Sequence, residues 1–314
     1  MDRSLLIPLD GSTCSEQALP TAASLAQASN ATLYLAHVHA PSALEPVYVE
    51  GLPVIDQELH SRVREHEQAY LDRLSAQVLA EQPGLRIQTA LLEPDEGGRD
   101  LAIAAALAEF AEQTASDYIV MTTHGRGGLS RFWLGSVASA LIHSTTTPLL
   151  LLHPNPGTAA AKPLAARRIL LPLDGSPLAE TIIPHAVRLG RADHARFTLL
   201  RVVEPLVLLA PAPFVAPTDL APERTSEQVV QAEAYLDRIA ERLRDEGAQV
   251  VTQVVVSERP AEAILEAAER SVADLIALST HGRSGLSRLL AGSVADKVLR
   301  GPRPILICRP AAGQ

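Results

Sequence analysis

The sequence has 314 residues, enough for two domains of about 150 residues that each bury their own hydrophobic core. Hydrophobic residues make up 47% of it and charged residues 20%, a balance that is typical of globular proteins and excludes a disordered chain. The formal net charge of −9 excludes the broad basic surface that binds nucleic acid or anionic membranes, so we expect neither as a partner.

The two cysteines, Cys14 and Cys308, belong to no CxxC pair and to no spacing typical of metal ligands. We therefore expect reduced thiols in a cytoplasmic protein. No apolar run approaches the ~18 residues needed to span a bilayer, and no basic segment followed by an apolar one begins the sequence. We expect no membrane segment and no targeting signal.

Short apolar runs alternate with longer helical patterns along the first half of the chain. The apolar runs predict strands at Leu5–Pro8, Thr32–Val38, Arg86–Leu92, Tyr118–Thr122 and Leu149–Leu152. The helical patterns predict helices near Ser15–Ser29, Asp56–Glu81, Arg99–Thr114 and Ser136–Ser144. Continuous apolar strands that alternate with helices are typical of a parallel sheet covered on both faces.

The second half repeats this order. Strands are predicted at Ile169–Pro172, Arg196–Val203, Val250–Val256, Leu275–Ser279 and Ile305–Cys308. Between the halves, His153–Pro163 is rich in Pro, Gly and Ala and has no periodic apolar face, which is typical of a linker. We place the domains at residues 1–154 and 167–314, with a linker at 155–166. Each domain is predicted as an α/β, doubly wound, five-stranded parallel sheet, with ligands at the carboxyl ends of the strands.

Repeated phrases indicate that the two halves are copies of one domain. L-L-I-P-L-D-G-S from Leu5 recurs as I-L-L-P-L-D-G-S from Ile169, and Y-L-D-R-L from Tyr70 recurs as Y-L-D-R-I from Tyr235. T-H-G-R recurs at Thr123 and Thr280. These spacings far exceed the ~20–50 residues of solenoid repeats, so the chain is predicted as a tandem duplication.

The strongest local signal is a glycine-rich loop in each copy, which follows a strand and precedes a helix. It reads T-T-H-G-R-G-G-L-S-R-F-W-L-G-S from Thr122 and S-T-H-G-R-S-G-L-S-R-L-L-A-G-S from Ser279. Glycine lets backbone amides approach a ligand, and the helix N-terminus attracts phosphate; the alternative is a tight connection without a ligand. The candidate phosphate-binding residues are Gly125, Gly135, Ser136, Gly282, Gly292 and Ser293.

An aspartate follows the first strand of each copy, in the phrase P-L-D-G-S. Asp10 and Asp174 should therefore lie at the same sheet edge as the glycine-rich loops. A carboxylate there could bind a ribose hydroxyl or hold Mg²⁺ against phosphates. The alternative is an Asx turn or a helix cap, for which D-G-S is well suited.

Histidines and arginines inside the glycine-rich loops are further candidates for phosphate contact. His124 and His281 have no acidic partner readable in the sequence, so a turn-forming or phosphate-contacting role is favoured over that of a general base. The arginines could neutralise phosphate or lie solvated on exposed loops; they are Arg126, Arg131, Arg283 and Arg288. We predict no catalytic residue.

At these loops the chain resembles the universal stress protein family in its tandem two-domain form. ATP-binding members of that family carry G-x-x-G, nine residues, then Gly followed by Ser or Thr. Gly125 and Gly135-Ser136 fit this spacing, as do Gly282 and Gly292-Ser293. Thr122 and Ser279 stand where the family has its first glycine.

The resemblance implies a Rossmann-like fold of the adenine nucleotide alpha hydrolase type and ATP, with Mg²⁺, as the cofactor. By position, Asp10 and Asp174 match the family aspartate near the ribose and phosphates. Val38 and Val202 match the residue whose backbone meets adenine, and Val137 and Val294 follow the motif serines.

The resemblance also implies a nucleotide-dependent stress-response sensor with two sites per chain and an unknown protein partner. The alternatives are a slow ATPase or autophosphorylating protein, a nucleotide-free interaction module, or one live and one dead site. Family members pair through their last strands, so an internal pseudo-dimer, and also a homodimer, are expected. The apolar, proline-rich segment Glu204–Pro217 is either a lid or partner surface, or a loop packed on its own domain.

Overall fold

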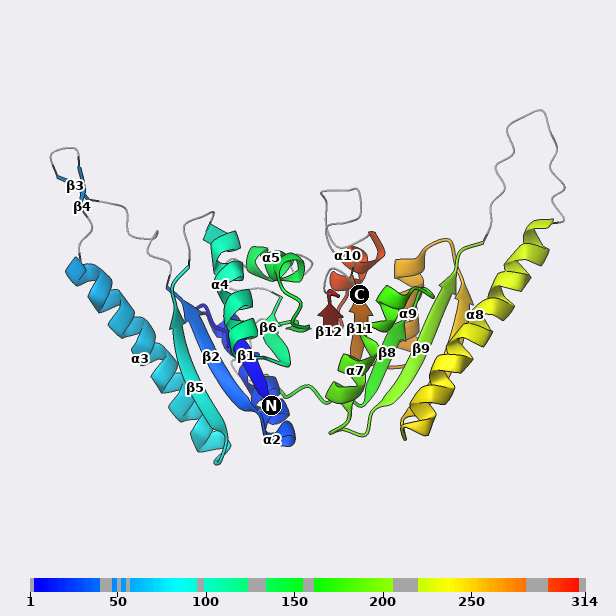
Figure 1. Cartoon of the computed structure of the whole chain (residues 1–314), viewed down its shortest axis with the longest axis horizontal. Helices are drawn as coiled ribbons and strands as arrows, with labels where there is room; N and C mark the ends of the chain where they lie inside the picture. Colours follow the sequence, from blue (N-terminus) through cyan, green and yellow to red (C-terminus); the bar gives the residue numbers. More distant parts are fainter. Residues whose placement is uncertain are drawn as a thin grey trace. The chain divides into compact units, whose positions relative to one another are not determined.

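A computed structural model describes residues 3–39, 47–49, 52–54, 57–94, 99–123, 134–154, 161–205, 220–280 and 293–310. The chain divides into two compact units, Met1–Leu164 and Ala165–Gln314. Both units are α/β, and the expected architecture of parallel strands alternating with helices is confirmed in each (Figure 1).

The sheet of the first unit has the strand order β7-β6-β1-β2-β5, and every neighbouring pair is parallel. Its strands are β1 (Ser4–Pro8), β2 (Thr32–Val38), β5 (Arg86–Leu92), β6 (Tyr118–Thr122) and β7 (Leu149–Leu152). The chain runs outward from β1 through β2 to β5 and then returns to β6 on the other side of β1. This reversal creates a topological switch point between β1 and β6, where open α/β sheets bind ligands.

The core of this unit consists of the apolar strand residues named by the sequence pattern. Leu6, Leu33 and Ile119 are fully buried, and so are the leucines of β7. Because helices cover both faces of the sheet, the strands are apolar on both faces instead of alternating. The helices are α2 (Leu19–Ser29), α3 (Gln57–Glu81), α4 (Arg99–Gln113) and α5 (Ser136–Ser144); α3 lies along β5 (Figure 1).

The helix predicted at Ser15–Ser29 is two helices, α1 (Thr13–Glu16) and α2. Pro20 lies in the first turn of α2, where the N–H group that proline lacks would have no partner within the helix. In a single helix over Ser15–Ser29, Pro20 would instead lie in the interior and remove a hydrogen bond. The sequence analysis also missed a short antiparallel pair, β3 (Val47–Val49) and β4 (Leu52–Val54). The predicted start of the following helix, Asp56, lies outside the described residues.

The second unit repeats the topology with the strand order β10-β9-β8-β11-β12, again parallel. Its strands are β8 (Arg168–Pro172), β9 (Arg196–Val203), β10 (Gln249–Val256), β11 (Leu275–Ser279) and β12 (Ile305–Cys308). Its helices are α6 (Pro177–Glu180), α7 (Ile183–Gly190), α8 (Leu220–Asp245), α9 (Pro260–Arg270) and α10 (Ser293–Leu299). The switch point lies between β8 and β11.

The two units also agree in register, which allows their residues to be compared one by one. Ser4 pairs with Thr32 at the start of β1 and β2, and Arg168 pairs with Arg196 at the start of β8 and β9. Each pair lies 164 residues from its counterpart, the spacing that separates Asp10 from Asp174.

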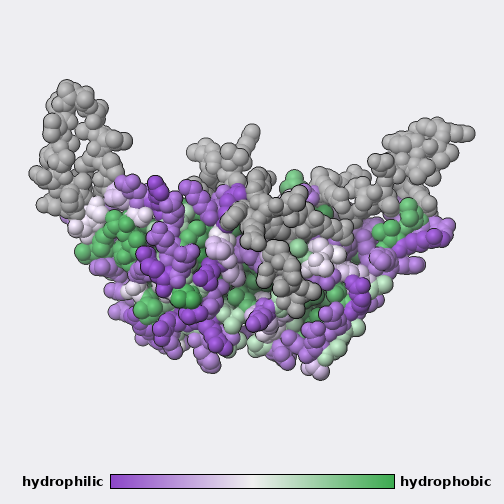
Figure 2. Space-filling model, turned by 180° about the vertical axis from the view of Figure 1, so that it is seen from behind, coloured by the Kyte–Doolittle hydropathy of each residue, from purple (hydrophilic) through white to green (hydrophobic). Residues whose placement is uncertain are grey.

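The face of the molecule drawn in Figure 2 is mainly hydrophilic, with hydrophobic patches between the polar residues. A few large apolar side chains of the described residues are well exposed, such as Leu101 and Val230. Within the described ranges, none of the helices has the length and hydrophobicity that a membrane span requires.

Candidate functional site

A cavity of about 850 Å³ opens at the carboxyl ends of β8, β9 and β11 in the second unit. Its volume lies in the range of pockets for small molecules and cofactors. Four residues that the sequence analysis named as candidates line it together, namely Asp174, Val202, Ser279 and Val294. The switch point of this sheet therefore carries an actual cavity.

Asp174 lies two residues after the end of β8 and shapes the turn that leads into α6. Its Oδ1 accepts hydrogen bonds from the Ser176 amide at 2.9 Å and from the Ser176 hydroxyl at 2.5 Å. Gly175 between them has φ of 84°, a conformation that favours glycine. Ser176 in turn caps α6 by accepting from the Ala179 amide. The alternative of an Asx turn and helix cap is thus realised in the geometry.

The first unit builds the same turn around Asp10. Asp10 Oδ1 accepts from the Ser12 amide at 3.0 Å and from the Ser12 hydroxyl at 2.6 Å. Gly11 has φ of 80°, and Ser12 caps α1 by accepting from the Ser15 amide. Both aspartates are therefore held rigidly at the sheet edge, which would also orient a carboxylate toward a ligand.

Tyr235, from α8, lies on the wall of the cavity beside this turn. Burial, followed by the Glu180 carboxylate and then Asp174, raises the pKa of its phenol above the ordinary value. Tyr70 of α3 is its counterpart, and burial together with Glu16 and Asp10 raises its pKa in the same way. Both phenols therefore keep their protons over the physiological pH range.

Three polar side-chain atoms in the cavity wall are buried without a hydrogen-bond partner among the described residues. They are Gln228 Oε1 and Tyr235 Oη on α8 and Thr280 Oγ1 just after β11. Thr280 is 1% exposed, so its hydroxyl is screened from bulk water. Buried polar groups are almost always hydrogen-bonded, and an orphaned one points to a bound group.

Arg201 is the one lysine or arginine among the described residues that line the cavity. It lies on β9, and its guanidinium donates to the Leu173 carbonyl oxygen over 3.5 Å. Asp174 and Glu204 line the same cavity, so the wall offers one positive and two negative charges. An anionic ligand there would face Arg201 as its nearest cation within the described residues.

Four residues of the cavity wall were not predicted from the sequence, namely Arg201, Gln228, Tyr235 and Thr280. A signal was present for two of them, since Tyr235 stands in the repeated Y-L-D-R phrase and Thr280 in the repeated T-H-G-R phrase. Arg201 and Gln228 have different residues at the matching positions of the first copy, so repetition gives no signal for them.

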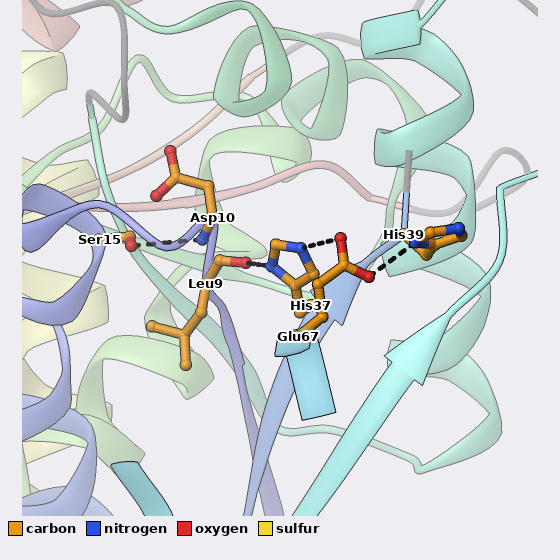
Figure 3. A network of polar contacts seen from close by, with 6 residues as sticks. All are labelled: Leu9, Asp10, Ser15, His37, His39 and Glu67. Atoms are coloured by element: carbon orange, nitrogen blue, oxygen red, sulfur yellow. Dashed lines mark hydrogen bonds and ion pairs between the residues drawn. The ribbon is translucent and has the colours of Figure 1, made fainter. Parts of the chain in front are cut away.

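In the first unit, the buried imidazoles of His37 and His39 at the carboxyl end of β2 meet the partly buried Glu67 of α3 (Figure 3). His39 Nδ1 lies 2.6 Å from Glu67 Oε2, and His37 Nε2 lies 3.4 Å from Glu67 Oε1. His37 Nδ1 lies 2.7 Å from the carbonyl oxygen of Leu9. Because a carbonyl oxygen only accepts, Nδ1 of His37 is the protonated nitrogen of this contact. We call these three residues the His–Glu cluster.

The helix end of the glycine-rich loop is described in the first unit. The Gly135 amide donates to the Thr123 carbonyl oxygen over 2.7 Å, which ties the start of α5 to the end of β6. Gly135 is the N-cap of α5 and provides no side-chain acceptor, so the first-turn amides, which include those of Ser136 and Val137, are available for an anion. In the second unit, Ser293 begins α10.

The remaining candidates occupy known places or lie outside the described residues. Val38 ends β2, and Thr122 ends β6, where it is buried. The candidates that lie outside are His124, Gly125, Arg126, Arg131, His281, Gly282, Arg283, Arg288 and Gly292, together with most of Glu204–Pro217. Within the described ranges, no group of three or more His, Cys, Asp or Glu side chains could hold a metal ion.

Comparison with known proteins finds the same family in both units. The universal stress protein family model matches residues 1–153 and 165–309. A universal stress protein of Mycolicibacterium smegmatis is 27% identical over 311 residues, which are 98% of this chain and 97% of the relative. Another, from Methanocaldococcus jannaschii, is 30% identical over 146 residues, which are 46% of this chain and 82% of the relative.

A solved structure of similar architecture covers the whole chain. A universal stress protein from Archaeoglobus fulgidus aligns with a TM-score of 0.64 and 17% identity, covering 98% of both chains. At this identity the likeness concerns the fold, and it agrees with two Rossmann-like domains in tandem.

Proposed function

Because the chain belongs to the universal stress protein family, we propose that it binds ATP, with Mg²⁺, at the carboxyl ends of its parallel strands. In this proposal the protein acts as a nucleotide-dependent regulator of the stress response, and nucleotide occupancy controls how it associates with a protein partner. Binding alone suffices for such a role, since a ligand stabilises the bound state by an amount set by its concentration relative to Kd.

One observation supports this proposal above the others: the cavity of the second unit contains buried polar atoms that have no hydrogen-bond partner within the part of the chain that the structure describes. Thr280 Oγ1 and Gln228 Oε1 both face a cavity large enough for a small-molecule cofactor. An unsatisfied buried hydroxyl or amide costs about 1–3 kcal/mol, a cost that a bound ligand removes. The donor set therefore fits a polar ligand with hydroxyl and anionic groups.

The wall of the cavity also divides into parts suited to the parts of a nucleotide. Leu178 and Ile264 supply apolar surface for a base. Asp174 is positioned by Ser176 to accept from a ribose hydroxyl or to hold Mg²⁺. Arg201 supplies positive charge for phosphate. These residues bind and orient; none of them is required to transfer a group.

The first test is a thermal melt of the full chain in Mg²⁺ alone and in Mg²⁺ with ATP. At a nucleotide concentration 100 times Kd, binding adds about 2.7 kcal/mol to the free energy of unfolding. Asp174→Asn keeps the oxygen that accepts from Ser176 but removes the negative charge, so the Mg²⁺-dependent part of the shift should decrease. Asp245→Asn changes an exposed carboxylate at the end of α8 and serves as the control.

A melting temperature that ATP leaves unchanged, together with no nucleotide released from the purified protein on denaturation, would refute the proposal and favour an interaction module without nucleotide. Covalently bound phosphate on the purified chain would favour the autophosphorylating alternative. Mass spectrometry of the released small molecules and of the intact chain separates these outcomes.

A further inference from the structure

The two units differ at three matched positions where the second unit has its cavity. Arg201, Val203 and Ala232 line that cavity. Strands β2 and β9 have the same register, so His37 corresponds to Arg201 and His39 to Val203. The repeated phrases at Tyr70 and Tyr235 align α3 with α8, so Glu67 corresponds to Ala232. The counterparts in the first unit are therefore the members of the His–Glu cluster.

The His–Glu cluster fills the space between β2 and α3 in the first unit. Glu67 reaches from α3 across to both imidazoles of β2, and the side chains of His37 and His39 are only 10% and 3% exposed (Figure 3). His60, also on α3, adds a fourth ring, whose centroid lies 5.9 Å from that of His39. The cluster is therefore a packed, mutually bonded set of side chains.

The second unit lacks the atoms that would close this space. Ala232 ends at its β-carbon, whereas a glutamate extends three further bonds to its carboxylate oxygens. The side chain of Val203 has no polar atom that could bond to α8 as His39 bonds to α3, and the guanidinium of Arg201 donates to the Leu173 carbonyl oxygen. The space that Glu67 and the imidazoles occupy in the first unit is thus part of an open cavity in the second.

A second, independent difference concerns the threonine after the fourth strand of each sheet. Thr123 Oγ1 has a protein partner, His153 Nδ1, at 3.4 Å. Thr280 Oγ1, at the matching position, is buried with no partner among the described residues. At this matched position the hydroxyl of the first unit has a protein partner, while that of the second is left for a ligand.

We propose that the nucleotide site is confined to the second unit, and that the His–Glu cluster keeps the corresponding place in the first unit closed. This inference rests on the proposed function, because it concerns the same ligand. It changes the expected stoichiometry from two nucleotides per chain to one.

Titration calorimetry of the full chain with MgATP, on protein stripped of nucleotide by unfolding and refolding, measures the stoichiometry directly. The expected value for the wild type is one per chain. Ala232→Glu places the first unit's carboxylate in the cavity and should reduce the value to zero, while Glu65→Ala, at an exposed position of α3, should leave it at one.

Exchanging all three residues in the first unit provides the gain-of-function test. A chain carrying His37→Arg, His39→Val and Glu67→Ala should bind two nucleotides if the cluster is what closes the site. Circular dichroism and the cooperativity of the melt show whether each variant folds.

Two nucleotides per wild-type chain, or one that survives Ala232→Glu in a folded chain, would overturn this inference while leaving nucleotide binding intact. A folded triple variant that still binds one nucleotide would show that the cluster does not close the site. No binding by any of the chains would instead refute the proposed function itself, so the two failures are distinguishable.

Discussion

Replacing Thr280 with valine should stabilise the protein, although most buried substitutions destabilise. Thr280 is 1% exposed, and its hydroxyl has no partner among the described residues, so the folded state bears the cost of desolvating it. Valine is close in shape and carries no such group. Relief of part of a cost of about 1–3 kcal/mol should raise the free energy of unfolding by about 1 kcal/mol and the melting temperature by about 2–4 °C.

The matched substitution in the first unit should have the opposite sign. Thr123→Val removes the hydroxyl that contacts His153 Nδ1 at 3.4 Å, so a loss of about 0.5–1 kcal/mol is expected. In the presence of MgATP, Thr280→Val should lose its advantage over the wild type, because it also removes a ligand contact and should weaken nucleotide affinity by about tenfold.

Chemical denaturation of the wild type and the two variants, with and without nucleotide, provides the assay. Equal destabilisation of both variants without nucleotide would refute this prediction, since the Thr280 hydroxyl would then be satisfied by water. Equal loss of nucleotide affinity in Thr123→Val would also refute it.

Three further predictions concern tyrosine, cysteine and glycine. The pKa values of Tyr70 and Tyr235 are raised in the folded state, so their stabilising contribution is full below the unfolded pKa of about 10 and is lost as the pH rises toward the folded values. The double Tyr→Phe variant should therefore lose less stability than the wild type at alkaline pH in denaturant titrations. An equal loss would contradict this prediction. Cys308 is buried, which raises the pKa of its thiol, so iodoacetamide should alkylate the partly exposed Cys14 first; mass spectrometry of the native protein checks the order, and faster labelling of Cys308 would be inconsistent with its burial. Gly190→Ala would place a methyl group 2.5 Å from a neighbouring methyl carbon, so a loss of about 1–3 kcal/mol is expected on denaturation, and a gain would show that the site can relax.

Most of the fold was predictable from local patterns because parallel strands buried on both faces leave a strong signature. The run at Leu149–Leu152 contains nothing but leucine and forms β7 over the same residues. The failures arose where the pattern is weak or interrupted. Pro20 divides a helix that is otherwise periodic, and the short strands β3 and β4 carry too few residues to establish a period.

The candidate site was predictable only in part. Asp174, Val202 and Ser279 lie at or near the carboxyl ends of β8, β9 and β11, and parallel topology brings these strand ends to one edge, so they were expected to meet. Arg201 and Gln228 lie in no repeated phrase. They belong to the site because β9 and α8, on which they lie, line the same cavity.

The duplication, the alternation of strands and helices, and the sheet edge at which the candidate residues gather follow from sequence alone, because repetition and hydrophobic periodicity are local properties that need no knowledge of contacts. The difference between the units does not. Glu67 and His39 are 28 residues apart in the chain, and their pairing depends on how α3 packs against β2. Only the tertiary structure shows that a carboxylate at one helix position closes a space which an alanine leaves open, because a cavity is defined by atoms that packing brings together and not by neighbours along the chain.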